Sequence, residues 1–465
     1  MSPIPSSTRA LPDPVAKKIQ DDSERHLEEL CAWLRIPSVS SSSAHVDDML
    51  AAATWLESKL TNAGLQTKRI ETNGFPMIYA ETPAVDGAPV ALVYGHYDVQ
   101  PAEPLELWNS PAFEPTLRDG NVYARGATDD KGQVLTHIHA VCDWMQSGEP
   151  LPMQIKFLIE GEEEVGSANL EAYLPDARDL SCDVVVVSDS SQYAEGLPAM
   201  TCGLRGIATY EIKVTGPSHD LHSGSFGGAV ANPAIALSQL LASMMDQSGR
   251  IQIKGFYDDV QPIPDAERAA WRQLPSDEPQ MRAESGVEAL HGESGFTTDE
   301  RRWARPTFDV NGITSGHQGE GVKTIIPSWA SAKFSFRLVP NQVPDAITQA
   351  VQEHIAALDL PGVQIELLPD HGASAMVTKS DSPYAIAASR AIESAFGVVP
   401  VPIREGGSIP ILADFQRHLG CDVLLLGWGQ NDDAMHSPNE KFSVADFHRG
   451  TLASAHLWAE LAADS

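Results

Sequence analysis

The chain is poor in cysteine for its length. Its 465 residues include five cysteines, Cys31, Cys142, Cys182, Cys202 and Cys421, an odd number without CxxC spacing. This pattern favours neither a disulfide framework nor a thiolate metal site, and it is typical of a reducing compartment.

Basic residues are also scarce. Lys and Arg number 32 against 63 Asp and Glu, so the formal net charge is −31. Nucleic-acid affinity comes from Lys and Arg that neutralise phosphates, and anionic membrane surfaces repel an acidic chain in the same way. We therefore expect neither nucleic acid nor membrane as a partner.

Long hydrophobic runs are absent. No apolar run approaches the roughly 20 residues that span a bilayer, and residues 1–18 lack the apolar stretch of a signal peptide. These absences and the cysteine pattern predict a cytoplasmic protein.

The sequence does contain the signals of a large α/β domain. Hydrophobic residues make up 42% of the chain and charged residues 20%, an ordinary globular composition. Unbroken β-branched runs are typical of strands buried on both faces of a sheet; they lie at 90–94, 155–159, 184–187 and 423–426. Apolar spacing predicts helices over 16–35, 47–63 and 132–146.

A second texture begins near residue 207. Apolar and polar residues alternate over 207–214, 330–338 and 363–368, as in antiparallel strands with one wet face, and helical patterns lie between them. The β-α-β-β-α-β order predicts a ferredoxin-like α+β domain at 207–380, inserted into a mostly parallel α/β domain formed by 1–206 and 381–465. The stretch 255–305 carries no motif.

Side chains that bind metals follow the predicted buried strands. In doubly wound sheets the ligand site lies outside the carboxyl ends of the strands. Taken alone, each of these residues is better explained as a surface-loop residue, and an Asp before the helix at 132–146 as a helix cap. Together they form one candidate ligand set: His96, Asp129, Glu164, Asp189 and His436.

Two imidazoles and three carboxylates are too many ligands for one catalytic zinc, which usually takes three. The set suits two divalent ions that share a bridging carboxylate, with Zn²⁺ favoured and Mn²⁺ or Co²⁺ possible. Asp98 could accept the other ring N–H of His96. In the run Glu162–Glu164, one carboxylate could bind metal while its neighbour faces the water, although such runs are usually solvated loops.

The sequence resembles the co-catalytic zinc metallopeptidases, which include aminoacylase, glutamate carboxypeptidase and succinyl-diaminopimelate desuccinylase, and it is most similar to their carnosinase-like, cytosolic non-specific dipeptidase branch. The matching stretches are GHYDVQP (95–101), ARGATDDKG (124–132), EGEEEVGS (160–167), VSDS (187–190), DLHSGSFGG (220–228), KTIIPSWASAKFSFRLVPNQ (323–342), REGGSIP (404–410) and HSPNEKF (436–442).

The resemblance implies a catalytic metal-binding domain and an inserted lid and dimerisation domain. It implies His96 and Asp189 on one zinc, Glu164 and His436 on the other, and Asp129 between them. Glu163 would be the general base that acts on a metal-bridging water. The Asp129–Asp130 peptide would be cis.

The resemblance also implies substrate contacts. His222 would reach the partner subunit's site in a homodimer and stabilise the oxyanion. Thr324, Arg337 and His371 match contacts in the lid, and Ser408 matches one in the core. Arg337 suits a substrate carboxylate, which a guanidinium grips with two hydrogen bonds.

We therefore expect a two-zinc exopeptidase that hydrolyses dipeptides or small peptides with a free C-terminal carboxylate. One alternative is an N-acyl-amino acid deacylase, a desuccinylase or a carboxypeptidase on the same scaffold. Another is a metal-dependent binding protein that has lost catalysis, which the complete ligand set and Glu163 disfavour.

Overall fold

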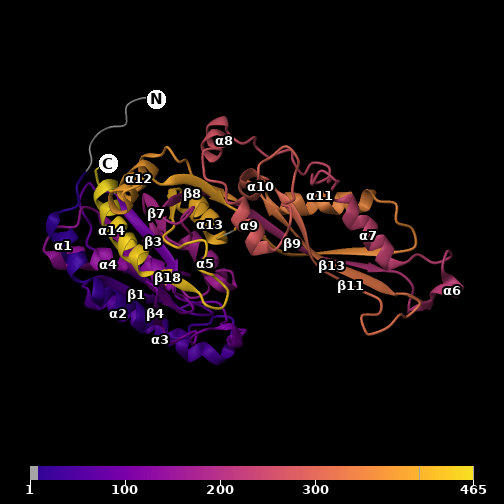
Figure 1. Cartoon of the computed structure of the whole chain (residues 1–465), viewed down its shortest axis with the longest axis horizontal. Helices are drawn as coiled ribbons and strands as arrows, with labels where there is room; N and C mark the ends of the chain where they lie inside the picture. Colours follow the sequence, from indigo (N-terminus) through magenta and orange to yellow (C-terminus); the bar gives the residue numbers. More distant parts are fainter. Residues whose placement is uncertain (1–8, 408, 464–465) are drawn as a thin grey trace. The chain divides into compact units, whose positions relative to one another are not determined.

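The computed structural model describes residues 9–407 and 409–463, which form two compact units (Figure 1). The first unit contains the described residues up to Cys202, Thr378–Ile403, and those from Asp414 onward. The second contains Gly203–Val377 and the described residues of Arg404–Ala413. Each unit is described by itself.

A twisted sheet forms the centre of the first unit. Its strands run in the order β1 (Gln66–Ile70), β2 (Met77–Glu81), β6 (Gln154–Glu160), β3 (Val90–His96), β7 (Val184–Val187), β17 (Asp422–Leu426) and β8 (Ala199–Leu204). The four central strands, β6, β3, β7 and β17, are parallel, and the flanking pairs are antiparallel. The expected α/β class with a mostly parallel centre is confirmed.

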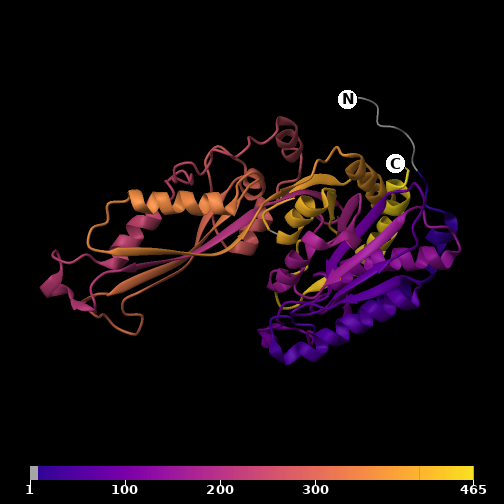
Figure 2. The same cartoon turned by 180° about the vertical axis from the view of Figure 1, so that it is seen from behind.

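Helices pack on both faces of this sheet, as the reverse view in Figure 2 also shows. The helices α4 (Lys131–Ser147), α12 (Pro383–Phe396) and α14 (Val444–Leu461) pack together, and Val93 of β3 belongs to the same hydrophobic core. The next residue, Tyr94, points to the other face, because side chains alternate along a strand. There its ring meets Phe415 of α13 (Pro410–Leu419), with 5.2 Å between centroids.

The prediction of a single helix over 16–35 is wrong. The chain forms α1 (Asp13–Asp21) and α2 (Ser23–Leu34), with a break at Asp22. The Asp22 carboxylate accepts hydrogen bonds from Lys18 and Arg25 on either side of the break. Both helices bury a face, so the apolar spacing runs through the break without marking it. The next helix, α3 (Val46–Asn62), lies where 47–63 was expected.

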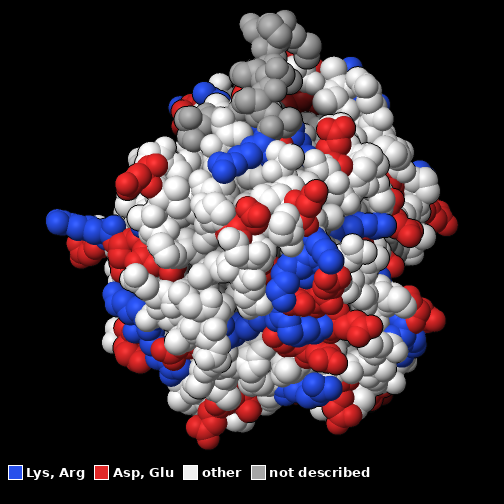
Figure 3. Space-filling view, turned by 90° about the vertical axis from the view of Figure 1, so that its left-hand side faces the viewer, with Lys and Arg blue, Asp and Glu red and all other residues white. Residues whose placement is uncertain are grey.

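A network of partly buried ion pairs connects helices of this unit. Arg25 pairs with Asp22, Glu29 and Asp143, and Lys59 also pairs with Glu29. Figure 3 shows Lys and Arg side chains set among Asp and Glu on one face of the molecule. Asp143 is fully buried and the other partners are partly buried, so these pairs also connect α2 to α3 and α4.

The second unit is an antiparallel sheet with two helices on it. The strand order is β11 (Thr307–Ser315), β13 (Trp329–Leu338), β9 (Gly206–Thr215) and β14 (Gln364–Ala373). Helices α7 (Pro233–Ser243) and α11 (Pro344–Ala357) share its core. Along the chain this is the β-α-β-β-α-β order expected for the ferredoxin-like insertion.

Short elements complete the described chain. In the second unit β10 (Leu221–His222) pairs with β12 (Ile325–Ile326), and 255–305 contains three short helices. Those helices and further short elements are α8 (Asp265–Trp271), α9 (Glu278–Ser285), α10 (Thr298–Ala304), α6 (Ser223–Phe226), α5 (Ala168–Tyr173), β4 (Thr116–Arg118), β5 (Asn121–Tyr123), β15 (Met376–Val377), β16 (Val401–Glu405) and β18 (Lys441–Ser443). Among the described residues, no helix is both long enough and apolar enough to cross a bilayer.

Candidate metal centre

The candidate ligands lie at the carboxyl ends of the parallel strands. His96 is the last residue of β3, Glu164 lies in the 3₁₀ turn after β6, and Asp189 follows β7 by two residues. His436 lies in the loop after β17, and Asp129 precedes α4. The Asp129–Asp130 peptide bond is cis, as expected.

Two groups of possible ligands share Asp129. The ligand atoms of His96, Asp129 and Asp189 lie within 4.8 Å of one another, as do those of Asp129, Glu164 and His436. The Oδ1 atom of Asp129 lies 3.2 Å from Nε2 of His96, and its Oδ2 atom lies 2.8 Å from Nε2 of His436. One carboxylate therefore faces two imidazoles, as a bridging ligand must.

The remaining distances complete the two groups. Asp189 Oδ2 lies 3.9 Å from Nε2 of His96, and Glu164 Oε2 lies 3.4 Å from Nε2 of His436. The His96 side chain is fully buried, whereas that of His436 is 56% exposed. His436 has a φ of 59°, in the left-handed region that residues other than glycine rarely adopt. Such a conformation is often found at a functional site.

The nitrogen and oxygen atoms of the candidate ligands are suited to binding cations. Within residues 9–407 and 409–463, Nε2 of His96 and Oε1 of Glu164 are buried without a well-formed hydrogen bond. The Nδ1 atom of His96 instead faces Asp98, 3.1 Å from its carbonyl oxygen and 3.3 Å from its Oδ1. This leaves Nε2 for another partner. Nitrogen and oxygen donors without sulfur suit Zn²⁺, Mn²⁺ or Co²⁺.

The carboxylates of the centre repel one another. Burial and the nearby Asp129 raise the pKa of Glu164 to about 8 and that of Asp189 to about 6. Burial also opposes ionisation of Asp129, but the nearby imidazoles of His436 and His96 outweigh it and lower the pKa. Bound dications would remove this repulsion, because an opposite charge at short range favours the ionised carboxylate.

Asp98 joins the two sides of the centre. It is fully buried, and its Oδ1 atom accepts a hydrogen bond from the backbone N–H of Glu163. Its Oδ2 atom accepts from the backbone N–H of Glu164 and from the hydroxyl of Ser40. Asp98 thus fixes the orientation of His96 and the turn that carries Glu163 and Glu164.

The environment of Glu163 favours its protonated form. Burial raises the pKa of Glu163 well above its usual range; nearby His96 opposes the shift, while Asp189 and Glu164 add to it. Its neighbour Glu162 differs, because its carboxylate is held by the side-chain amide of Asn169 at 2.6 Å. Of the two, Glu163 is the one that interacts with the candidate ligands.

The predicted substrate residues fall into two pairs in the second unit. His222 and Thr324 are neighbours, since the Ser223 N–H donates to the carbonyl of Thr324. Arg337 pairs with Ile207 at one end of β9. His371 lies at the same end, because its backbone N–H donates to the Thr209 hydroxyl. Ser408 lies outside the described residues.

Arg337 and His371 lie near the first residues of β9, whereas His222 and Thr324 lie beyond its other end. The β9–β13 register runs from Leu338 opposite Gly206 to Trp329 opposite Thr215. The β10–β12 ladder that carries His222 continues from the Trp329 end. At about 3.3 Å per residue the intervening strand spans roughly 26 Å. Arg337 and His222 of one chain are therefore too far apart to contact the same dipeptide.

One buried residue escaped the sequence reasoning. Glu440 lies within the HSPNEKF stretch, and its carboxylate accepts hydrogen bonds from the backbone of the loop that carries Asp129. The only signal in the sequence was its position four residues after His436.

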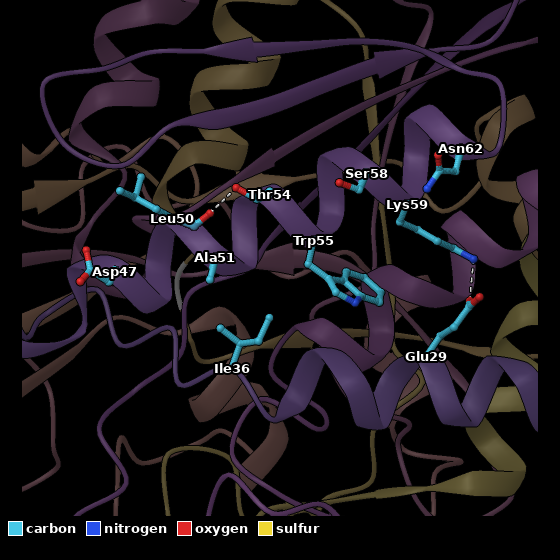
Figure 4. A pocket seen from close by; sticks show the side chains of 10 residues that line it. All are labelled: Glu29, Ile36, Asp47, Leu50, Ala51, Thr54, Trp55, Ser58, Lys59 and Asn62. Atoms are coloured by element: carbon cyan, nitrogen blue, oxygen red, sulfur yellow. Dashed lines mark hydrogen bonds and ion pairs between the residues drawn. The ribbon is translucent and has the colours of Figure 1, made fainter.

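A separate hollow of about 650 Å³ lies between α2 and α3 (Figure 4). Trp55 and Leu50 line it, and the ion pair of Lys59 with Glu29 closes one side. None of the candidate metal ligands lines this hollow.

Comparison with known proteins identifies the family. The model of Peptidase family M20/M25/M40 matches residues 92–460. The chain belongs to this family. As a member of family M20/M25/M40, it is a hydrolase of the peptidase class.

Relatives within the family are similar over almost the whole chain. The Cys-Gly metallodipeptidase DUG1 of Saccharomyces cerevisiae is 32% identical over 95% of this chain and 96% of that protein. The Beta-Ala-His dipeptidase of Rattus norvegicus is 34% identical over 83% of this chain and 80% of that protein. The resemblance to the carnosinase-like branch is confirmed.

The fold is also shared. The structure of an M20 family metallo-carboxypeptidase from Sulfolobus solfataricus matches with a TM-score of 0.84 and 30% identity, over 94% of this chain and 99% of that one.

Proposed function

We propose that the protein is a dipeptidase that uses two divalent cations, zinc in the first place, to hydrolyse dipeptides or small peptides with a free C-terminal carboxylate. One observation carries the proposal: the two oxygens of Asp129 face His96 and His436 at 3.2 and 2.8 Å. The dipeptidase names of the yeast and rat relatives support the substrate class.

The chain offers ligands for both ions. His96 and Asp189 would hold one, Glu164 and His436 the other, and Asp129 would lie between them. When bound, the cations would polarise the scissile carbonyl and lower the pKa of a water molecule.

Glu163 is the general base of the proposed mechanism. It takes a proton from the attacking water and passes it to the nitrogen of the leaving amine. Its electrostatic interaction with His96 and Asp189 supports this role, and bound dications would favour its ionised form, which is the form that accepts a proton. Asp98 keeps Glu163 in place through its backbone N–H.

The second unit supplies substrate recognition and the dimer contact in this proposal. Arg337, with His371 and Ser408, binds the substrate carboxylate of its own subunit. His222 and Thr324 act in the partner subunit's site, where His222 stabilises the oxyanion. The roughly 26 Å of strand between the two pairs supports this division and hence a homodimer. The cysteine pattern suits the cytoplasm.

A carboxypeptidase or N-acyl-amino acid deacylase activity is the second candidate, favoured by the similarity to the Sulfolobus metallo-carboxypeptidase. A substrate panel separates the two. We expect dipeptides to be cleaved faster than tripeptides, longer peptides or N-acyl amino acids. Faster cleavage of any other class would identify the second candidate as correct.

Glu163→Gln is the decisive variant. Turnover should fall by about 10²–10⁴-fold, because the amide cannot accept the proton, while elemental analysis should still find two ions per chain. Glu162→Gln is the matched control and should keep its activity, since that carboxylate is bound to Asn169. Equal activity of wild type and Glu163→Gln would remove Glu163 from the mechanism.

Chelation tests the cations directly. Dialysis of the wild type against a strong chelator should abolish hydrolysis, and added Zn²⁺ or Mn²⁺ should restore it. Undiminished hydrolysis by the metal-free protein would refute the proposed function.

A further inference from the structure

Glu440 is a buried carboxylate with four hydrogen-bond donors around it. Its Oε1 atom accepts from the backbone N–H groups of Thr128 and Asp129, at 3.0 and 3.1 Å. Its Oε2 atom accepts from the backbone N–H of Gly126 at 3.0 Å and from Nη1 of Arg125 at 2.7 Å. The side chain is fully shielded from solvent. Burying a charge is costly unless it is paired and hydrogen-bonded, and Glu440 is both.

The same segment is tied to the Asp129 loop a second time. Asp433 accepts a hydrogen bond from the hydroxyl of Thr128 at 2.9 Å, and that hydroxyl also lies 2.6 Å from the carbonyl of Lys441. His436 lies in the sequence between Asp433 and Glu440. The loop that carries Asp129 is thus fastened to the segment that carries His436 on both sides of that histidine.

We propose that Glu440 is a positioning residue for the two-cation centre. By holding the Asp129 backbone against the His436 segment, it fixes the carboxylate so that its two oxygens face different histidines. Residues that orient metal ligands typically change metal affinity by 10–100-fold when they are replaced. The inference rests on the proposed function, because it presumes that the cluster binds cations.

The experiment compares two buried ion pairs. Glu440→Gln keeps the size of the side chain but removes its charge and one acceptor. Glu460→Gln is the matched control, because Glu460 is also buried and bonded to an arginine, Arg390, at 2.7 Å, on helix α14. The Zn²⁺ affinity of each metal-free protein is measured by competition with a chromophoric chelator, and stability by thermal unfolding of the same samples.

We expect Glu440→Gln to lose at least about tenfold in Zn²⁺ affinity, and Glu460→Gln to bind as tightly as the wild type even where both unfold at lower temperature. Wild-type affinity in Glu440→Gln, or an equal loss in both variants, would overturn the inference. A wild type that binds no Zn²⁺ would instead refute the proposed function.

Should Glu440→Gln not fold, Thr128→Val carries the same test. It removes the hydroxyl bonded to Asp433 and Lys441 without changing charge or size. It should also weaken Zn²⁺ binding, and wild-type affinity in this variant would count against the inference.

A second inference concerns two cysteines. The Sγ atoms of Cys182 and Cys421 lie 3.6 Å apart, and both side chains are partly exposed. Cys421 immediately precedes β17 and Cys182 lies two residues before β7, and these strands pair in parallel with Asp422 opposite Val184. The thiols therefore lie at the amino ends of the central strands, whereas the candidate metal ligands follow the carboxyl ends.

We infer that this thiol pair is a site of reversible oxidation by hydrogen peroxide. The Cys421 thiolate attacks the peroxide, forming a sulfenic acid and releasing hydroxide. The Cys182 thiolate then attacks that sulfur, the S–O bond breaks, and hydroxide leaves as the disulfide forms. Overall, two thiols and one peroxide give one disulfide and two waters. Hydrogen bonding from Cys182 lowers the pKa of Cys421, which supports Cys421 as the attacking group.

Thiol counting and peptide mapping test the pair. After peroxide treatment and denaturation, two of the five thiols should be lost, a peptide joining Cys182 to Cys421 should appear, and dithiothreitol should reverse both changes. Cys31→Ser should still form the bond, whereas Cys182→Ser and Cys421→Ser should not. Five remaining thiols, irreversible sulfinic acid or a link between chains would each overturn the inference.

Discussion

Single side chains of this protein have separable tasks. Asp129 connects the two candidate ligand groups, Asp98 orients His96 and holds the backbone N–H of Glu163, and Glu162 is bound to Asn169. In the second unit Arg337 is partly buried on β13, and this burial lowers its pKa, although Asp309 opposes the shift. A guanidinium is nevertheless always charged at neutral pH.

Arg337→Lys should therefore affect binding more than chemistry. A lysine cannot form the paired hydrogen bonds of a guanidinium, and a charged hydrogen bond contributes about 1.5–3 kcal/mol. We expect KM for a dipeptide to rise by about 10–100-fold, with kcat changed much less. Steady-state kinetics measure both constants.

Lys333→Arg, an exchange at an exposed position on the same strand, is the control and should leave KM unchanged. An unchanged KM in Arg337→Lys would exclude Arg337 from recognition of the carboxylate.

Candidate ligands were easier to predict than the groups that hold them. His96 and Asp189 follow buried apolar runs, so the rule that sites lie at the carboxyl ends of parallel strands locates them. Glu440 bonds to the backbone N–H of Asp129, which lies 311 residues away in the sequence. A backbone partner has no side-chain signature, so no pattern in the sequence predicts this contact.

At the scale of elements, prediction succeeded where burial is complete. The central strands β3, β6, β7 and β17 were located to within two residues, because strands buried on both faces are continuous apolar runs. The sequence did not predict the bounds of strand β11. Its apolar residues Val310 and Ile313 are exposed, so the strand lacks the alternation of buried apolar and exposed polar side chains. The spacing of apolar residues indicates which face of a strand is buried, so it gives little information about a strand that is exposed on both faces.

Helix α4 is buried from Lys131 to Trp144, including His137 and His139. Burial lowers the pKa of each histidine to about 3, against an ordinary value of 6.5. As the pH falls below about 6.5, these two histidines become protonated in the unfolded chain but remain neutral in the folded chain. The folded state should therefore lose stability between about pH 6.5 and pH 3.

His137→Gln tests this prediction. Each such histidine contributes at most about 1.4 kcal/mol per pH unit to the loss, so the variant should show a shallower fall in the free energy of unfolding below pH 6. Urea denaturation at a series of pH values measures it. His418→Gln, at an exposed position on α13, should retain the wild-type slope. Parallel curves for wild type and His137→Gln would contradict the explanation.

At the scale of the whole molecule, the proposed function would require two chains to work as a pair. Each active site would combine the metal centre and Arg337 of one subunit with His222 and Thr324 of the other. The separation of Arg337 from His222 along β9 requires this arrangement if both contact one substrate. Two inactive variants should then rescue each other.

His222→Ala and Glu163→Gln chains, each inactive alone, should regain activity when they are mixed and allowed to exchange subunits. One site of each mixed dimer would contain an intact Glu163 and an intact His222, so activity should approach a quarter of the wild-type value at equal mixing. Mixing either variant with itself is the control. Lack of rescue in a sample where exchange is demonstrated by labelled subunits would mean that each chain works alone.

The order of the ligands along the chain also has a consequence during biosynthesis. His96, Asp129 and Asp189 are all translated before the second unit, whereas the group with Glu164 is complete only after His436, which follows that unit in the sequence. Strand β17, the neighbour of β7, emerges equally late. A product truncated before residue 436 would therefore keep His96, Asp129 and Asp189 but would lack both His436 and the Glu440 carboxylate that holds the Asp129 backbone.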